Sequence, residues 1–230
     1  MELDEVGSTN AWLMERAEET PDGLWLRAER QTAGRGRRGR SWSQQSGNLA
    51  ASTLVRPAAV LPAQQLSFVA ALALDDALAG WVAPQRRVLK WPNDLLLDGC
   101  KLAGILLERS GQAVVIGFGV NLVDYPGGVH PPATSLAAAG IDPPSAVQLL
   151  AALRESFTAW RLRWQDWGFE PVRTRFLERA HGLGARLVAR LSDGTELTGS
   201  FDGLDGDGAL RLRLDGGTIR AIHAADVFAL

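Results

Sequence analysis

Two tight-turn signals between three consecutive apolar runs constrain the fold more than any other feature of this sequence. Asp98-Gly99 separates NDLLL from KLAGILLE, and Asp-Gly readily adopts the positive φ angles of a two-residue hairpin. Ser110-Gly111 then precedes the third run, AVVIGFGVNL. Three apolar runs joined by two such turns predict an antiparallel meander over residues 93–122.

Further helices and strands are expected around the meander. Apolar residues at helical spacing, with Ser8, Thr9 or Asn10 available as the N-cap, predict a first helix at 8–20. Similar patterns predict strands at 23–30, 48–55 and 87–91, a buried helix at 61–82, a Pro/Gly-rich loop at 123–144, and helices at 145–164 and 168–180.

The sequence changes character near Gly182. From there to Leu230 only short alternating segments follow, separated by the turn signals Asp193-Gly194, Asp207-Gly208 and Asp215-Gly216. This pattern predicts a small β-barrel, and hence two domains, 1–181 and 182–230. Gly184–Leu230 carries five arginines against seven acidic residues, which argues against nucleic-acid binding by the barrel.

The overall composition fits a soluble globular protein in a reducing compartment. Of 230 residues, 46% are hydrophobic, and the net charge of −2 argues against a molecule that binds nucleic acid through its whole surface. Cys100 is the single cysteine, so no internal disulfide can form. The N-terminal residues lack the basic and apolar regions of a signal peptide, and no apolar run reaches the ~18 residues of a transmembrane helix. We therefore expect a cytoplasmic protein with no membrane partner.

Lysine is unusually scarce. Of the 24 lysines and arginines, only Lys90 and Lys101 are lysines, and they lie eleven positions apart. A genome-wide preference for arginine codons would explain the scarcity. Arginine cannot replace lysine, however, where a compact ammonium group must approach reacting atoms, so both lysines are candidate functional residues.

A loop of glycines and arginines occupies residues 31–42, QTAGRGRRGRSW. Its glycines match G-x-G-x-x-G, and Gly34–Ser41 matches a P-loop with Arg40 in place of the lysine. Both motifs require a following helix, whereas RSWSQQSGN has no apolar stripe. An RNA-binding arm and a solvated loop without a ligand stay open as alternatives. The favoured interpretation is a flexible loop that folds over a compact anionic ligand, because glycines give mobility and arginines donate paired hydrogen bonds to phosphate or carboxylate.

Four segments together carry a specific resemblance. GRGRRGRSW, KWPNDL, KLAGILLE and GFGVNL, in this order, resemble the motifs of biotin–protein ligases, and STN on the first helix and Gln31 match as well. The resemblance covers essentially the whole chain. It implies an α+β fold: a catalytic domain like that of class II aminoacyl-tRNA synthetases, with a mixed, largely antiparallel sheet and flanking helices, followed by an SH3-like barrel. It also implies a two-step reaction. Biotin and MgATP give biotinyl-5′-AMP and pyrophosphate, and a lysine of a biotin carboxyl carrier domain, in acetyl-CoA carboxylase or a related carboxylase, then takes the biotin as an amide.

The same resemblance implies the site residues. Biotin is expected to lie among neutral polar side chains, glycines and three cations: Ser8, Thr9, Asn10, Gln31, Arg35, Gly36, Arg37, Lys101, Gly104 and Gly117. ATP is expected to contact Arg37, Arg38, Arg40, Trp42, Lys90, Asn93 and Asn121. Leu106 and Trp42 are expected to help form an apolar slot for the valeryl chain of biotin.

Four residues are expected to act in the chemistry. Arg35, Arg37 and Lys101 would offset the repulsion between the biotin carboxylate and the α-phosphate. Asp94 is expected to orient or deprotonate the acceptor lysine in the second step. His130, His181 and His223 lack metal-ligand spacing, so no metal site made of protein ligands alone is expected, and Mg²⁺ would arrive with ATP.

Three further expectations concern alternatives and partners. A lipoate-type acyl-protein ligase shares the fold and the acyl-adenylate chemistry, and an RNA-binding module that uses the arginine loop is the alternative from another class. The first motif lies almost at the start of the sequence, which leaves no room for the DNA-binding domain of the regulatory ligases, so we expect the monofunctional type and no DNA partner. A homodimer formed by edge strands of the meander is left open.

Overall fold

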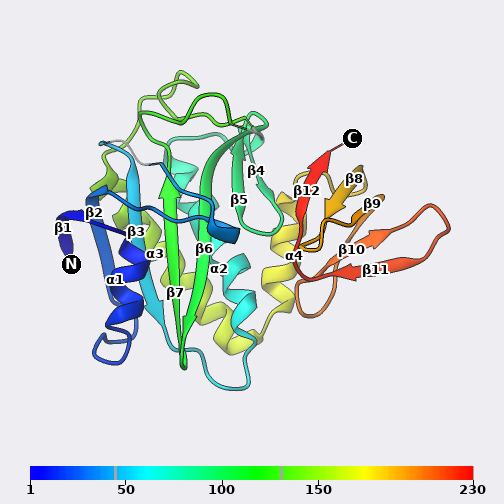
Figure 1. The fold of residues 1–230 in the computed structure, drawn as a ribbon, viewed down its shortest axis with the longest axis horizontal. Coiled ribbons are helices and arrows are strands. Elements are labelled where there is room, and N and C mark those ends of the chain that lie inside the picture. Colours follow the sequence, from blue (N-terminus) through cyan, green and yellow to red (C-terminus); the bar gives the residue numbers. More distant parts are fainter. Residues whose placement is uncertain (44–45, 130–131, 230) are drawn as a thin grey trace.

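The computed structural model of the chain describes residues 1–43, 46–129 and 132–229. Strands form two sheets, a seven-stranded one in the order β1-β2-β3-β7-β6-β5-β4 and a five-stranded one in the order β11-β10-β9-β8-β12 (Figure 1). The larger sheet contains β1 (Glu2–Val6), β2 (Trp25–Gln31), β3 (Leu49–Val55), β4 (Arg87–Lys90), β5 (Asp94–Leu97), β6 (Cys100–Ser110) and β7 (Ala113–Val120). The smaller contains β8 (Arg186–Arg190), β9 (Glu196–Leu204), β10 (Leu210–Arg213), β11 (Ile219–Ile222) and β12 (Asp226–Ala229).

The predicted meander is present as β5, β6 and β7, which pair antiparallel in sequence order. Asp98 and Gly99 have φ angles of 49° and 81°, the positive values that the turn between β5 and β6 requires. Every strand of the meander nevertheless has a partner on both sides, since β4 pairs with β5 and β3 with β7. The outer strands of this sheet are β1 and β4, but residues 106–110 of β6 pair with β7 alone, so the pairing of two copies through the meander stays a prediction.

The first strand was not predicted. β1 pairs parallel with β2, with Leu3 opposite Ala28, while the other pairings in this sheet are antiparallel. The sheet is therefore mixed and largely antiparallel, as expected for the fold class. The segment ELDEV gave no strand signal because it carries three acidic residues and no clear apolar alternation.

Helices cover both faces of the large sheet (Figure 1). The main core lies between the sheet and α2 (Leu66–Ala77), α3 (Ala146–Trp167) and α4 (Glu170–Arg179), whereas α1 (Thr9–Glu15) covers a smaller core on the other face. Side chains of β7 alternate accordingly, with Ile116 and Phe118 in the main core and Val115 in the core beneath α1. The glycines at 117 and 119 therefore lie on the face that α1 covers.

Two helices are shorter than predicted. The first begins after the N-cap Ser8, whose side chain accepts a hydrogen bond from the Ala11 N–H, and ends at Glu15 rather than at residue 20. The second is α-helical only from Leu66 to Ala77, with single 3₁₀ turns on both sides, instead of continuing over 61–82. None of the helices in the described ranges combines the length and the apolar character needed to span a bilayer.

The small sheet packs against α4 through β9, and Phe228 of β12 lies near Lys90 of β4. The Trp91 indole N–H donates to the Gly208 carbonyl at 3.1 Å, and the Gln65 amide donates to the Gly206 carbonyl at 3.3 Å. Four of the five strands of the small sheet were predicted, and β12 was not.

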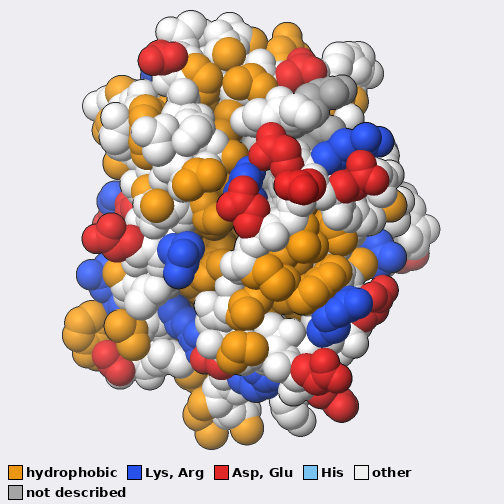
Figure 2. Space-filling view, turned by 90° about the vertical axis from the view of Figure 1, so that its left-hand side faces the viewer, with side chains coloured by type: hydrophobic (Ala, Val, Ile, Leu, Met, Phe, Trp, Pro, Cys, Tyr) orange, Lys and Arg blue, Asp and Glu red, His pale blue; other side chains and the backbone are white. Residues whose placement is uncertain are grey.

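On the side of the molecule nearest β1, acidic and basic side chains are interspersed with apolar ones, which fits the small net charge (Figure 2).

Candidate active site

A cavity of about 570 Å³ opens on the α1 face of the large sheet, below the arginine loop and beside β12. Its floor is formed by β6 and β7, where Gly104 lies opposite Gly119 and Leu106 lies opposite Gly117. The lining includes every residue predicted for the site except Arg38: Ser8, Thr9, Asn10, Gln31, Arg35, Gly36, Arg37, Arg40, Trp42, Lys90, Asn93, Asp94, Lys101, Gly104, Gly117 and Asn121.

Neutral polar side chains dominate one end of the cavity, the uncharged end, where Arg35 and Glu108 are the charged neighbours. The Gln31 side-chain oxygen accepts hydrogen bonds from the Thr9 N–H at 2.8 Å and the Thr9 hydroxyl at 3.0 Å. Ser52, fully buried on β3, donates toward the Thr9 hydroxyl oxygen at 2.7 Å and the Asn10 side-chain oxygen at 2.6 Å. Ser52 was missed in the sequence, although Ser52 and Thr53 are the polar exceptions in the buried strand Leu49–Val55. These bonds hold the side chains of α1 and β2 in fixed positions.

Asn10 is held against the floor. Its amide N–H₂ donates to the Leu106 carbonyl at 3.3 Å and to the Glu108 carboxylate at 2.9 Å. A Cβ at position 117 would overlap the Asn10 side chain, so Gly117 is required for this close approach. Glu108 was also missed in the sequence. It lies 3.9 Å from the Arg35 guanidinium and so faces both the helix and the arginine loop.

Trp42 lies across the middle of the floor. A Cβ at Gly119 would overlap its indole, and one at Gly104 would lie 3.1 Å from it. The Lys101 ammonium is 5.7 Å from the centre of the ring, within the range of a cation–π contact. On β7, Gly119 beneath Trp42 is only two positions from Gly117 beneath Asn10. The uncharged end is therefore close to the lysines, and Trp42 lies between them.

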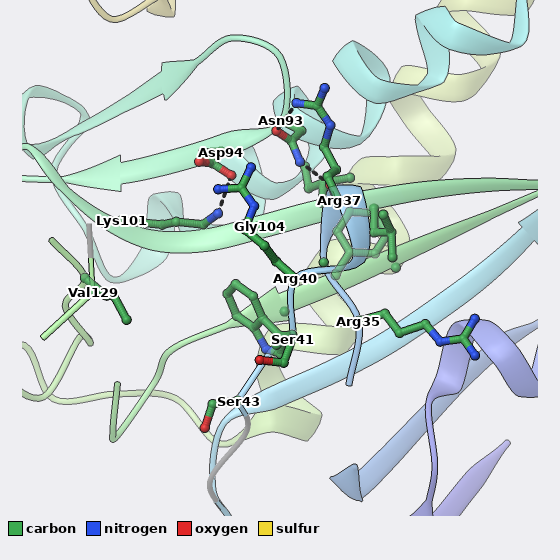
Figure 3. A pocket seen from close by; sticks show the side chains of 18 of the residues that line it. Arg35, Arg37, Arg40, Ser41, Ser43, Asn93, Asp94, Lys101, Gly104 and Val129 are labelled. Atoms are coloured by element: carbon green, nitrogen blue, oxygen red, sulfur yellow. Dashed lines mark hydrogen bonds and ion pairs between the residues drawn. The ribbon is translucent and has the colours of Figure 1, made fainter. Parts of the chain in front are cut away.

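The other end of the cavity is cationic. The Lys101 ammonium lies 2.6 Å from the Asp94 carboxylate, and Lys90 is the strand partner of Asp94 (Figure 3). The Lys90 ammonium also lies 5.7 Å from the Phe228 ring of β12. Burial lowers the pKa of Lys90 from its ordinary value, and the charge of Lys101 lowers it further against the opposing effect of Asp94. The hairpin thus brings Lys90, Asp94 and Lys101 together.

The arginine loop distributes its side chains in different directions. Arg37 donates to the Asn93 side-chain oxygen at 3.2 Å, and burial lowers its pKa from the usual value. Arg35 extends away from Lys101 and Asp94, toward Glu108 (Figure 3). Residues Arg37–Gly39 of the arginine loop form a 3₁₀ turn, in which Arg38 has a φ of 55°.

Arg38 and Arg40 contact the small sheet. The Arg38 guanidinium lies 3.1 Å and that of Arg40 2.8 Å from the two carboxylate oxygens of Asp226 on β12. This aspartate lines the cavity but was not predicted, because nothing in the segment ADVF relates it to a loop 186 positions earlier.

Asn121 lies at the end of β7, buried and lining the cavity. Its side-chain N–H₂ donates to the Thr134 carbonyl at 3.0 Å, while its Oδ1 has no hydrogen-bond partner among the described residues. His130 lies outside the described residues. Within the described ranges, no group of three or more His, Cys, Asp or Glu side chains is arranged to hold a metal ion.

The cavity therefore has an end of neutral hydrogen-bonding groups and a cationic end, joined by one floor. A family model described as "Biotin/lipoate A/B protein ligase family" matches residues 3–121, and one described as "Biotin protein ligase C terminal domain" matches residues 183–230. The class of the protein is therefore that of the biotin and lipoate protein ligases.

Individual relatives narrow the class. The chain is 44% identical to a "Biotin--[acetyl-CoA-carboxylase] ligase" of Paracoccus denitrificans, over 98% of both proteins. It is 37% identical to the enzyme of the same name from Mycobacterium tuberculosis, over 98% of this chain and 87% of the relative. The structure described as "Biotin protein ligase from Aquifex aeolicus in complex with biotin and ATP" matches with a TM-score of 0.88 and 26% identity, covering 100% of this chain and 98% of that one. The chain belongs to the biotin–protein ligase family, as the sequence motifs predicted.

Proposed function

We propose that the cavity binds biotin at its uncharged end and ATP at its cationic end, with the reacting atoms meeting between Trp42 and Lys101. The protein is an enzyme, a biotin–[acetyl-CoA-carboxylase] ligase, as its family membership and relatives show. What the family does not give is the role of each side chain. The observation that carries our assignment is the change, along one glycine-lined floor, from neutral hydrogen-bonding groups to lysines and arginines.

The uncharged end suits the ureido ring of biotin. That ring is neutral and has both donors and acceptors, and Ser8, Thr9, Asn10 and Gln31 offer both kinds of group. Because Ser52 and Glu108 already fix these side chains, little conformational entropy is lost on binding. Leu106 and the Trp42 ring border the path toward Lys101 and suit the valeryl chain.

The cationic end suits a triphosphate. Arg37, Arg40 and Lys90 line it, and Asn93 holds Arg37 by a hydrogen bond. The Asn121 side-chain oxygen has no partner there and would accept from an adenine amino group or a ribose hydroxyl. Asp94 and Asp226, the carboxylates of the described lining, are each paired with cations, so Mg²⁺ would be held chiefly by the phosphates and would neutralise their charge.

The first step joins biotin to the α-phosphate. A biotin carboxylate oxygen attacks the α-phosphorus, a P–O bond forms, the bond to the bridging oxygen breaks, and pyrophosphate leaves with the electron pair. Lys101 and Arg37 counter the repulsion between two anions and stabilise the charge that develops on the phosphoryl oxygens. Arg35 would have to turn away from Glu108 to assist them.

The second step transfers biotin to an amine. The neutral acceptor lysine attacks the carbonyl carbon of biotinyl-5′-AMP, an amide forms, and AMP leaves. Asp94, whose carboxylate lies 2.6 Å from the Lys101 ammonium, would orient the incoming ammonium group and take its proton. The acceptor would be a biotin carboxyl carrier domain of acetyl-CoA carboxylase or a related carboxylase. The division at residues 181 and 182, the cytoplasmic location, the absence of a DNA partner and a homodimer stay predictions.

One experiment tests the function directly. The protein is mixed with labelled biotin, MgATP and a carrier domain, and covalent label on the carrier is measured. Label should depend on ATP and disappear when the acceptor lysine of the carrier is changed to arginine. If pyrophosphate and a labelled adenylate form but no carrier becomes labelled, the acceptor is wrong. If neither forms, the proposed site is wrong.

A further inference from the structure

Asp226 occupies a position that the chemistry of the cavity leaves unexplained. It is a carboxylate in the end of the cavity assigned to phosphates, and its side chain is 26% exposed. Both of its oxygens are used: Oδ2 faces Arg38 at 3.1 Å and Oδ1 faces Arg40 at 2.8 Å. A negative group placed here would by itself repel a nucleotide, so it requires a reason.

The place of Asp226 in the fold explains how it reaches the loop. β12 is the outer strand of the small sheet, paired on one side with β8, and its other side faces the cavity. Residues 225–228 all line the cavity. The small sheet thus supplies one wall of the nucleotide end, and Asp226 is the acidic side chain of that wall.

The charge state of Asp226 fits a permanent ion pair. Burial alone would raise its pKa, but the hydrogen bond from Arg40 and the charges of Arg40, Arg38 and Arg37 hold the pKa below its usual value. The group is therefore ionised at neutral pH. With Arg38 at a φ of 55°, a region that non-glycine residues seldom adopt, the pair also stabilises a loop conformation that is unfavourable by itself.

A carboxylate with two oxygens on two guanidinium groups presents the same pattern of acceptors as a phosphate. We propose that Asp226 is a positioning residue that holds Arg38 and Arg40 beside the cavity and is exchanged for the phosphates when a nucleotide binds. The inference rests on the proposed function in one respect, namely that the cationic end receives ATP. Nucleotide binding then releases the arginine loop from the small sheet as the loop closes over the ligands.

The exchange has a measurable consequence. Since ATP must displace Asp226 from two partly exposed pairs, removing its charge should tighten ATP binding by roughly fivefold, the size expected for such pairs. The same change should loosen the arginine loop in the absence of nucleotide. Trypsin should then cleave after the arginines of residues 35–40 faster in the variant than in the wild type. A purely structural role would give weaker ATP binding instead.

The test compares Asp226→Asn with Asp202→Asn. Asp202 is a matched control, because it is also an aspartate of the small sheet paired with two arginines, Arg211 and Arg213, and it does not line the cavity. ATP affinity is measured by calorimetry with the full chain, together with the KM for ATP in pyrophosphate release and the rate of loop cleavage. Asp226→Asn should lower both ATP constants and leave the KM for biotin unchanged, Asp202→Asn should change neither, and Asp226→Glu should restore the wild-type ATP constants.

Coupling to the arginines separates exchange from a general charge effect. In an Arg38→Gln, Arg40→Gln background, Asp226→Asn should no longer tighten ATP binding. An ATP affinity that is unchanged or weaker in Asp226→Asn overturns the exchange. So does an equal tightening of ATP binding by Asp226→Asn in the Arg38→Gln, Arg40→Gln background. Wild-type protein that forms biotinyl-5′-AMP in the same assays shows that only the exchange, and not the proposed function, has failed. Wild-type protein that binds no ATP overturns both.

Discussion

Replacing Gly117 by alanine should damage biotin binding and leave ATP binding intact. The added methyl group would overlap the Asn10 side chain, which lies over Gly117 and over Ser52, the partner of Gly117 on the neighbouring strand β3. To regain the 3.4 Å of an ordinary contact, the Asn10 oxygen has to retreat by about 1 Å. Gly117 itself contributes no functional group, and the atoms nearest to the added methyl group belong to Asn10, so the effect on the ligand should pass chiefly through Asn10.

The magnitude follows from the bonds that Asn10 makes. Because Ser52 lies beside Gly117 in the same sheet, a retreat of Asn10 from the sheet would lengthen the 2.6 Å bond from Ser52 to as much as about 3.6 Å, which is beyond hydrogen-bond distance. Loss of one buried hydrogen bond, with a misplaced contact to the ligand, costs about 1–2 kcal/mol. That corresponds to a rise of about 5- to 30-fold in the KM for biotin. The KM for ATP should stay within about twofold, because this end of the cavity holds no phosphate in our assignment.

Pyrophosphate release, titrated separately with biotin and with ATP, measures both constants. Gly80→Ala is the control, since a Cβ at Gly80 meets nothing within 4 Å and Gly80 does not line the cavity. Thermal unfolding of both variants shows whether the folded fraction is unchanged at the assay temperature. A biotin KM for Gly117→Ala within twofold of wild type, or an equal rise in both constants, would refute the assignment of the two ends.

Three other changes test separate parts of the site. Lys101→Ala should slow adenylate formation at least about tenfold, or roughly 1.4 kcal/mol, and an unchanged rate of pyrophosphate release would remove Lys101 from the mechanism. Asp94→Asn should slow the transfer of biotin from preformed adenylate to the carrier; transfer at the wild-type rate would exclude the acid–base role. Burial, and to a smaller extent the charge of Lys90, lowers the pKa of His181 from its usual 6.5. As the pH falls, the unfolded state therefore binds a proton before the folded state does. The free energy of unfolding decreases from pH 6.5 down to the lowered pKa. Wild-type protein should therefore lose more Tm than His181→Asn between about pH 7.5 and pH 5.5, and equal losses would contradict this reasoning.

The sequence predicted the parts of the site that are formed by local hydrogen-bonded structure. Asp98-Gly99 specifies a two-residue turn, and that turn pairs Lys101 with Leu96, two positions from Asp94 on β5. The Lys101 ammonium then lies 2.6 Å from the Asp94 carboxylate. The period of two along β7 likewise places Gly117 and Gly119 on the same face. The motifs supplied the rest of the predicted lining through the resemblance to a family.

Residues that act through distant packing were not predictable in the same way. Ser52 and Glu108 lie on β3 and β6, and their roles depend on which helix covers that face of the sheet. Asp226 lies on a four-residue strand, too short for a periodic signal, and its partners come from the opposite end of the sequence. Long-range pairings of this kind are set by tertiary packing rather than by local propensity.

The pairing of Arg38 with Asp226 also has a consequence for the order of assembly. The two residues are 188 positions apart, and β12 follows every other strand of the described chain. During synthesis the whole glycine floor, both lysines and the arginine loop leave the ribosome before the wall that β12 provides. Because contacts of such separation form late, the large sheet can fold while the nucleotide end is still open. In our assignment, an incomplete chain would contain the end of the cavity that binds biotin but lack the strand that forms one wall of the ATP end. Adenylate synthesis would then begin only when β12 has joined the small sheet.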